Sequence, residues 1–244
     1  MARAYVHRPP YPEELYAFLA SLPSRRRVAL DLGCGPGKIA RRLAVDFARV
    51  DAVDPSLAML RVADDGRQSN INWIHGSAES VGLTGMYDLI TAGASVHWMD
   101  HEIVFPRMAR VLAPGGFLAV IDGDEARDAP WQSEWAGFLR HWLGRLGRAY
   151  DPGGHREWMS EFQPWMDVAG RRTFDCRFSQ TVDGFIECQH SRSTWSRANL
   201  GPDLTLAFDA DLRDLLSPHA VDDVVTYWIR TELVWGRPRS EPAD

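Results

Sequence analysis

The ten residues Val28-Ala-Leu-Asp-Leu-Gly-Cys-Gly-Pro-Gly37 constrain the fold of this chain more than any other segment. This apolar run carries a carboxylate at Asp31 and passes into alternating glycines, and a second run, Val50-Asp-Ala-Val-Asp54, also ends in a carboxylate. Short apolar runs that end at turn residues are typical of buried strands. The pattern therefore predicts a strand, a tight glycine turn, a helix and a second strand.

The spacing of the glycines separates two classes of nucleotide-binding turn. Dinucleotide-binding folds use Gly-x-Gly-x-x-Gly, in which the third glycine lets the helix pack closely against the strand. Here Gly33, Gly35 and Gly37 alternate, and Lys38 occupies the place of that third glycine. Because the chain also lacks a recognisable Tyr-x-x-x-Lys pair, the sequence disfavours a nicotinamide-dependent oxidoreductase.

Strand and helix patterns alternate along most of the chain. Helices are predicted over 13–22, 37–46 and 101–112, and after a Ser56 cap, where Leu57, Met59 and Leu60 are expected to face the sheet. Strands are predicted over 27–32, 49–54, 70–76, 87–92, 117–121, 174–181 and 221–235. This order predicts an α/β fold with a doubly wound, mostly parallel seven-stranded sheet.

The predicted organisation has five segments. Residues 1–24 form an entry segment and helix, 25–122 the nucleotide-binding core, 123–172 a helical cap inserted after the fifth strand, 173–236 the part that completes the sheet, and 237–244 a tail. The cap is rich in tryptophan, includes Trp158 and Trp165, and is expected to break near 151–154.

Composition excludes several classes of protein. The 244 residues are 45% hydrophobic, enough for a substantial core, yet the chain has no run long enough to cross a bilayer and no signal-peptide pattern, which favours a cytoplasmic location. Cys34, Cys176 and Cys188 have no paired metal spacing, so no metal is expected. The net charge of −6 argues against a nucleic-acid partner. Oligomeric state is not readable from the sequence.

Two further strings carry a family resemblance. With the glycine turn, Tyr87-Asp-Leu-Ile-Thr-Ala-Gly-Ala-Ser-Val-His-Trp-Met-Asp100 and Arg110-Val-Leu-Ala-Pro-Gly-Gly-Phe-Leu118 resemble the class I S-adenosylmethionine-dependent methyltransferases. The nearest group is the small-molecule, type 11, trans-aconitate-methyltransferase-like branch. The likeness covers residues 5 to 122 well. It implies a Rossmann-like fold, S-adenosyl-L-methionine as cofactor, and O-, N- or carboxyl methylation of a small molecule.

The cofactor-binding hypothesis follows from the chemistry of the donor. Glycine lets main chain approach a ligand without side-chain collision, and a carboxylate at Asp54 can accept from both ribose hydroxyls. By resemblance, Asp31 faces the methionine ammonium, Ala78 serves the adenine, and Ser77 stands where the family is usually acidic. The alternative is a fortuitous turn with surface aspartates. The predicted cofactor residues are Arg8, Tyr11, Asp31, Gly33, Cys34, Gly35, Gly37, Asp54, Pro55, Met59, Ser77, Ala78, Glu79 and Ala92.

Methyl transfer mainly requires alignment and exclusion of water, and a base only when the acceptor is a hydroxyl, amine or carbon acid. His97 is the predicted general base, because it follows the fourth strand, whose carboxyl end lies beside the ligand in open α/β sheets. The alternative is that His97 and Trp98 form a structural cap on the loop.

The acceptor site has two interpretations as well. Trp98, Trp131, Trp135 and Trp142 are predicted to line it, although tryptophans at helical spacing more often pack in a core. Arg171, Arg172, Arg192 and Arg197 are candidates to bind a carboxylate, and the alternative is solvated surface arginines.

Missing motifs narrow the function further. The chain has no Asp- or Asn-Pro-Pro-Tyr tetrapeptide after the fourth strand, which disfavours a DNA amino-methyltransferase, and no Pro-Cys nucleophile for cytosine C5 chemistry. The leading hypothesis is a small-molecule methyltransferase. A cofactor-binding protein that catalyses a non-methylating reaction, or serves as a binding module, is the alternative.

Overall fold

The computed structural model describes residues 2–151 and 161–243, so Trp158 and positions 152–154 of the predicted break lie outside the described residues. The chain forms two compact units. The sheet unit comprises residues 10–123, 157–174 and 231–244, and the helical unit comprises 1–9, 124–156 and 175–230. Most of the predicted tryptophan-rich segment therefore lies in the same unit as residues 175–230.

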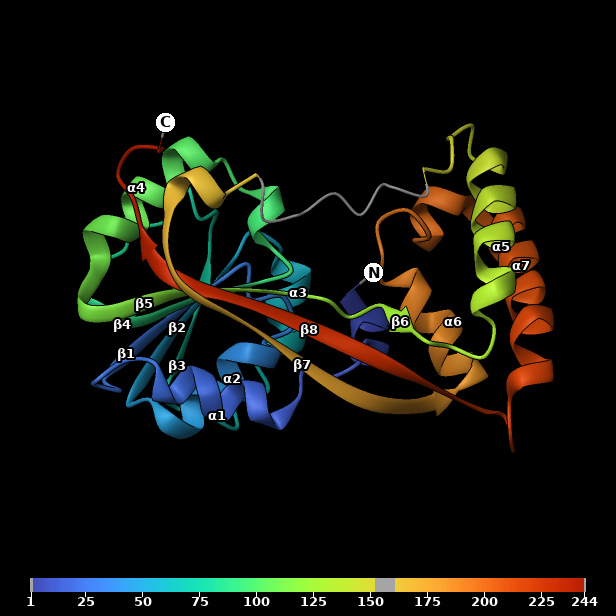
Figure 1. Cartoon of the computed structure of the whole chain (residues 1–244), viewed down its shortest axis with the longest axis horizontal. Coiled ribbons are helices and arrows are strands. Elements are labelled where there is room, and N and C mark those ends of the chain that lie inside the picture. Colours follow the sequence, from blue (N-terminus) through green and yellow to red (C-terminus); the bar gives the residue numbers. More distant parts are fainter. Residues whose placement is uncertain (1, 152–160, 244) are drawn as a thin grey trace. The chain divides into compact units, whose positions relative to one another are not determined.

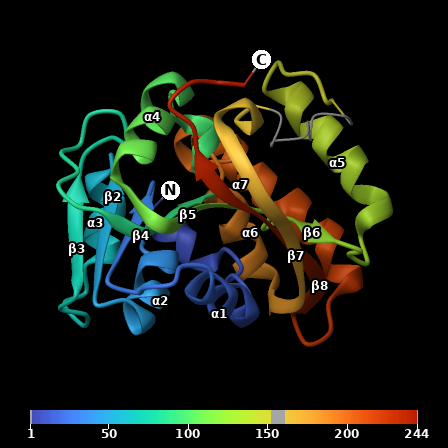
Figure 2. The same cartoon turned by 60° about the vertical axis from the view of Figure 1, so that its left-hand side comes forward.

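Eight strands form one sheet, in the order β3-β2-β1-β4-β5-β8-β6, with β7 paired to β8 outside this path (Figures 1 and 2). The first five strands are parallel neighbours, and β8 runs antiparallel to β5. The strands are β1 (Val28–Leu32), β2 (Arg49–Asp54), β3 (Ile71–His75), β4 (Tyr87–Gly93), β5 (Leu112–Asp122), β6 (Ala126–Arg127), β7 (Met166–Thr181) and β8 (Val224–Pro238). The predicted doubly wound, mostly parallel α/β class is confirmed.

The sequence prediction differs from the structure in three strands. β6 was not predicted, because two residues carry no alternation of apolar and polar side chains. β5 includes the Pro-Gly-Gly segment that was expected to precede it: Gly116 packs where a Cβ would lie 2.8 Å from the Asp88 carbonyl oxygen. β7 begins eight residues before Phe174, so Arg171 and Arg172 lie in a strand rather than in a helical cap.

The α-helices are α1 (Glu13–Ser21), α2 (Lys38–Asp46), α3 (Leu57–Ala63), α4 (His101–Val111), α5 (Gln132–Arg145), α6 (Val182–His190) and α7 (Arg197–Leu216). Short 3-10 helices are η1 (Ala2–His7), η2 (Val96–Trp98), η4 (Gln163–Trp165) and η5 (Ser217–His219). No helix within the described residues is both long and apolar enough to cross a membrane.

Helices cover both faces of the parallel sheet. Leu15, Leu19, Ile39 and Leu43 of α1 and α2 pack in one apolar cluster of the sheet unit, and Val104, Phe105 and Met108 of α4 pack in another. A third cluster, built around Trp131, Trp142 and Phe208, forms the core of the helical unit.

The prediction for α3 was wrong at one position. Leu60 is buried, but Leu57 is 49% exposed. Helix α3 begins just after the carboxyl end of β2. We attribute the exposure of Leu57 to the position of the first helical turn at this edge of the sheet, where no other element of the described chain packs on the side chain. The Ser56 cap is confirmed, because its hydroxyl accepts a hydrogen bond from the Met59 N–H.

A buried polar pair connects β2 and β4 across β1. The Tyr87 hydroxyl donates to Asp51 Oδ2 at 2.8 Å, and both side chains are buried. Burial, followed by the hydrogen bond to the Asp51 carboxylate, raises the pKa of Tyr87, which therefore stays a donor at neutral pH.

We predict that Tyr87→Phe lowers the free energy of unfolding by about 1 to 2 kcal/mol, because it leaves the buried Asp51 carboxylate with one donor fewer. Urea denaturation followed by circular dichroism measures this. Tyr150→Phe is the control, because the Tyr150 ring contacts Arg140 through its face. Equal losses in the two variants would contradict the prediction.

Candidate functional site

The three alternating glycines all adopt left-handed backbone, with φ of 66° at Gly33, 53° at Gly35 and 82° at Gly37. A Cβ on Gly33 would lie 2.5 Å from Ser95 Cβ, and one on Gly37 would lie 2.4 Å from the Trp73 ring. A Cβ on Gly35 would meet no heavy atom of the described chain within 4 Å. Gly33 and Gly37 therefore serve packing, whereas Gly35 presents bare main chain to open space.

The carboxylate of Asp54, at the end of β2, holds this turn. Its Oδ2 accepts from the Gly35 N–H at 2.8 Å, and its Oδ1 accepts from the Ser56 N–H at 2.8 Å. The Cys34 N–H donates to the Val53 carbonyl oxygen at 3.0 Å, which adds a second link between turn and strand. A carboxylate offers about four acceptor positions, and these two bonds use two of them.

Asp31 lies behind the turn, with 1% of its surface exposed. It accepts from the Ala40 N–H at 3.1 Å and from the Thr91 hydroxyl at 2.7 Å, so it links β1 to α2 and β4. The pKa of Asp31 is raised to about 7, first by burial and to a smaller extent by the Asp54 charge, against the opposing effect of these two hydrogen bonds. This carboxyl therefore titrates near neutral pH, where a nearby ligand cation would favour its ionised form.

Tyr11 lies close to the carboxyl end of β4. A Cβ on Gly93 would lie 3.3 Å from the Tyr11 hydroxyl oxygen and 2.3 Å from Ile39, so the glycine permits both to approach. Ala92 is buried beside it in the strand. The Ser95 hydroxyl donates to the Leu32 carbonyl oxygen at 2.8 Å, which ties the following loop to the glycine turn.

His97 and Trp98 lie on η2, directly after this loop. Both are exposed, Trp98 to 73%, and their ring centroids are 5.0 Å apart. Neither side chain is fixed in a core, so the structure places an imidazole and an indole on the surface of the segment that follows β4.

The predicted adenine side combines the ends of β2 and β3. The Pro55 carbonyl oxygen contacts His75 Nε2 at 3.1 Å, and Met59 and the exposed Leu57 follow on α3. Ser77 pairs with the Ser80 hydroxyl at 3.0 Å, and Glu79 accepts from the Asp100 N–H at 3.1 Å.

The Ala78 carbonyl oxygen accepts from Arg107 Nε at 3.1 Å. Ser77, Ala78 and Glu79 therefore each have a hydrogen-bond partner within the sheet unit.

Sequence reasoning missed three supporting residues. Ser95 and Trp73 occupy the space that a Cβ at Gly33 or Gly37 would need, and Thr91 donates to Asp31. The run of small residues at the end of β4 and just after it could have pointed to Thr91 and Ser95, whereas nothing in the sequence distinguishes Trp73 from an ordinary apolar strand residue.

The structure corrects the predicted acceptor lining. Trp131 and Trp142 are 1% and 0% exposed and pack edge-to-face against Phe185 and Phe208, so both belong to the core of the helical unit. They lie there because each contacts further aromatic rings of that cluster, as the packing alternative expected. Trp135 is half-buried and stacks on Phe138.

Arg8 lies in the helical unit, within an ionic cluster. It donates to the Ser191 hydroxyl at 2.8 Å and to Asp124 Oδ2 at 3.3 Å, while Arg192 donates to Asp124 Oδ1 at 3.0 Å. The other candidate arginines are dispersed: Arg197 pairs with Glu187, Arg172 stacks on Phe18 and Phe174, and Arg171 is 3.5 Å from the Gln163 side-chain oxygen. Only Arg192 joins Arg8.

Comparisons with known proteins agree with this geometry. Residues 29–116 match the family model described as methyltransferase domain. The chain is 34% identical over 148 residues to an uncharacterized methyltransferase of Mycobacterium tuberculosis strain H37Rv, covering 59% of this chain and 56% of that protein. It is 33% identical over 155 residues to a trans-aconitate 2-methyltransferase of Methylobacterium radiotolerans, covering 58% and 59%.

A solved structure from Anaeromyxobacter dehalogenans, described as a type II methyltransferase, superposes with a TM-score of 0.71 at 25% identity over 94% of this chain and 97% of that one. The chain spans about half the length of the curated relatives it matches. Residues 29–116 are therefore similar in sequence to methyltransferase domains, and the fold resembles that of a solved methyltransferase.

The match to a methyltransferase domain implies S-adenosylmethionine as the cofactor, and the described residues fit it. Gly35 offers open main chain, the Asp54 carboxylate adjoins it through the Gly35 N–H, and Leu57 at the start of α3 exposes an apolar side chain.

We predict that substitution by alanine has different effects at Gly35 and at Gly37. Gly35→Ala adds left-handed strain of about 1 kcal/mol and fills the space beside the open main chain, so it weakens S-adenosylhomocysteine binding more than folding. Gly37→Ala overlaps Trp73 and lowers the free energy of unfolding by about 1 to 3 kcal/mol more. Calorimetric titration and urea denaturation measure the two effects. Wild-type affinity in Gly35→Ala would refute the assignment.

We also predict a pH signature for Asp31. Its folded pKa, about 7, lies above the unfolded value of 3.8, so the folded state binds more protons between these values. The free energy of unfolding contributed by this group therefore falls as pH rises from about 4 to about 7. Relative to Asp31→Asn, the wild type loses stability over this window. Parallel stability curves for the two proteins would be inconsistent with a buried, titrating Asp31.

Proposed function

We propose that this protein is an S-adenosylmethionine-dependent methyltransferase that esterifies a carboxylate of a small polycarboxylic acid. The proposal that the protein binds S-adenosylmethionine rests on the open main chain at Gly35, which the Asp54 carboxylate holds. Relatives named trans-aconitate 2-methyltransferase support the acceptor class.

The chain's own residues divide the work of binding. Asp54 accepts from the ribose hydroxyls, Asp31 neutralises the methionine ammonium, and Leu57 with Met59 covers the adenine. The bound cofactor supplies a methyl group on a positively charged sulfur. Because methyl transfer removes the positive charge of the sulfur, the protein contributes mainly the alignment of donor and acceptor and the exclusion of water.

A carboxylate acceptor removes the need for a base. Carboxyl groups have ordinary pKa values near 4, so the acceptor is ionised at neutral pH. In this proposal His97 shapes the segment after β4 or contacts the acceptor, and does not remove a proton.

The ionic cluster of the helical unit supports carboxylate recognition. Arg8 and Arg192 both contact Asp124, which follows the end of β5 by two residues. Guanidinium groups bind carboxylates by paired, charge-assisted hydrogen bonds. The Asp124 carboxylate holds both arginines in position, and we propose that the helical unit uses these two guanidinium groups to bind a carboxylate.

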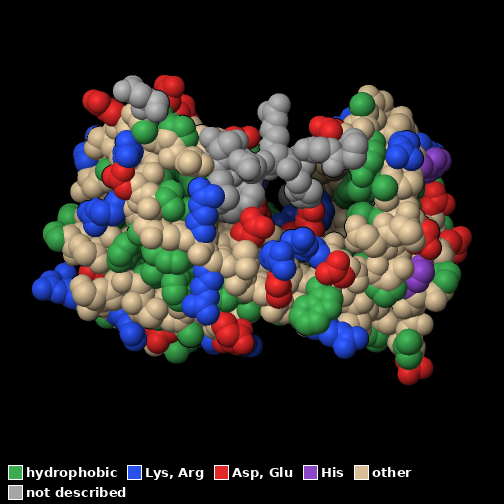
Figure 3. All heavy atoms as spheres, in the orientation of Figure 1, with side chains coloured by type: hydrophobic (Ala, Val, Ile, Leu, Met, Phe, Trp, Pro, Cys, Tyr) green, Lys and Arg blue, Asp and Glu red, His purple; other side chains and the backbone are tan. Residues whose placement is uncertain are grey.

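We also propose that the protein is cytoplasmic and has no nucleic-acid or membrane partner. The net charge is −6, and Figure 3 shows Lys and Arg side chains interspersed with Asp and Glu over the face drawn. A phosphate-binding surface would instead gather one sign of charge.

The test is an assay with S-adenosylmethionine, trans-aconitate, other di- and tricarboxylates, and phenol and amine controls, read by mass spectrometry. We expect a methyl ester of a polycarboxylate. Arg192→Gln should raise KM for it at least about tenfold, since a charge-assisted pair is lost. Arg197→Gln, whose arginine pairs with Glu187, is the matched control and should leave KM unchanged. Methylation of only hydroxyl or amine acceptors would overturn the acceptor class.

His97→Asn provides a second arm of the assay. A general base contributes about 100-fold or more to rate, so the carboxylate proposal expects a loss in kcat of less than about tenfold. A loss above 100-fold, together with a changed pH profile, would restore His97 as a base.

A further inference from the structure

One outward face of the helical unit carries chemistry that the proposed function does not use. Arg127 on β6 lies directly opposite Trp228 on β8, so the two share a face of the sheet, and Arg230 lies two residues further along the same face. The intervening Ile229 and the preceding Tyr227 are buried. The strand alternation therefore turns Arg127, Trp228 and Arg230 away from the core.

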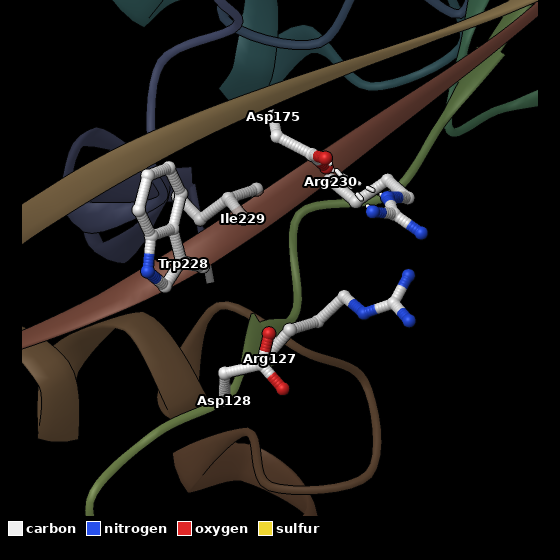
Figure 4. Close-up of a pocket in the computed structure, with 6 residues that line it drawn as sticks. All are labelled: Arg127, Asp128, Asp175, Trp228, Ile229 and Arg230. Carbon is white, nitrogen blue, oxygen red and sulfur yellow. Dashed lines mark hydrogen bonds and ion pairs between the residues drawn. The ribbon is translucent and has the colours of Figure 1, made fainter.

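These side chains line a cavity of about 240 Å³ within the helical unit. Figure 4 shows the two guanidinium groups on one side and the Trp228 indole on the other. Trp228 is 46% exposed, although its strand neighbours pack in the core. The lining residues are Arg127, Asp128, Asp175, Trp228, Ile229 and Arg230.

The two arginines differ in their pairing. Arg230 binds Asp175 through two hydrogen bonds of 2.6 and 2.8 Å, so its charge is compensated within the protein. No ion pair to Arg127 is found within residues 2–151 and 161–243, where its side chain is exposed. Asp175 also has its pKa lowered, first by the hydrogen bonds from Arg230 and to a smaller extent by the charge of Arg127. Arg127 is therefore the cation available to a ligand.

We infer that this cavity binds a small planar organic anion, a single-ring aromatic carboxylate, with its carboxylate on Arg127 and its ring against the Trp228 indole. Arginine forms a planar fork that matches a carboxylate, and the exposed indole offers a flat apolar surface. The cavity is smaller than the roughly 300 to 1,000 Å³ typical of drug-sized ligands, which restricts the occupant to about one ring. The Asp128 carboxylate in the wall disfavours a second negative charge.

The features also discriminate between a ligand and a protein partner. Tryptophan and arginine are enriched at protein interfaces, but interfaces bury broad surfaces with few charges at their centre. Here the exposed indole borders a hollow whose wall carries four charged side chains, two of each sign. This combination favours a small ligand with one charged end.

The experiment is a fluorine NMR titration of the full chain with 4-fluorobenzoate, and with the uncharged 4-fluorobenzamide as the matched probe. We expect 4-fluorobenzoate to bind at least about tenfold more tightly, because only it pairs with Arg127. Arg127→Gln should remove this preference, and Trp228→Leu should weaken both probes by removing the ring surface. Arg26→Gln makes the same charge change at an exposed arginine of the sheet unit and should bind 4-fluorobenzoate as the wild type does.

Two outcomes would overturn the inference. One is 4-fluorobenzoate binding that is unaffected by both Arg127→Gln and Trp228→Leu, which would place the probe elsewhere. The other is concentration-dependent association of the wild-type chain, measured by sedimentation, that Trp228→Leu abolishes, which would identify the face as an interface between copies. Circular dichroism of each variant verifies that it is folded.

Discussion

The site depends on one carboxylate that bridges two main-chain N–H groups. Asp54 accepts from Gly35 on one side and from Ser56 on the other, each at 2.8 Å. The first bond holds the turn after β1, and the second holds the entry to α3. The same side chain therefore fixes both the bare main chain at Gly35 and the start of the neighbouring helix.

The turn also depends on what surrounds it. Gly33 and Gly37 are glycines because Ser95 and Trp73 fill the space of a Cβ, while Gly35 is a glycine beside open space. Asp31 lies behind the turn as a buried carboxyl with a pKa near 7, raised first by burial and further by the charge of Asp54. A ligand cation near Asp31 would favour the ionised form of this carboxyl.

The sequence predicts the strands and the glycine turn around residues 28–54 well, because their signals are local. The glycine spacing and the Ser56 cap are patterns of neighbouring residues, and the second strand has the predicted bounds, 49–54. Predictions that depended on tertiary packing failed. Leu57 is exposed, and Trp131 and Trp142 are core residues, because burial depends on segments distant in sequence. The link between Arg8 and Arg192 through Asp124 joins segments far apart in the sequence and has no local signal.

We propose that Asp54 both holds the turn and accepts hydrogen bonds from the ribose hydroxyls. Calorimetric titration of S-adenosylhomocysteine into wild type and Asp54→Asn, at a temperature where both are folded, tests it most directly. Replacing one carboxylate oxygen by an amide removes charge-assisted hydrogen bonds, so affinity should fall by about tenfold to several hundredfold. Undiminished affinity in Asp54→Asn would contradict the account.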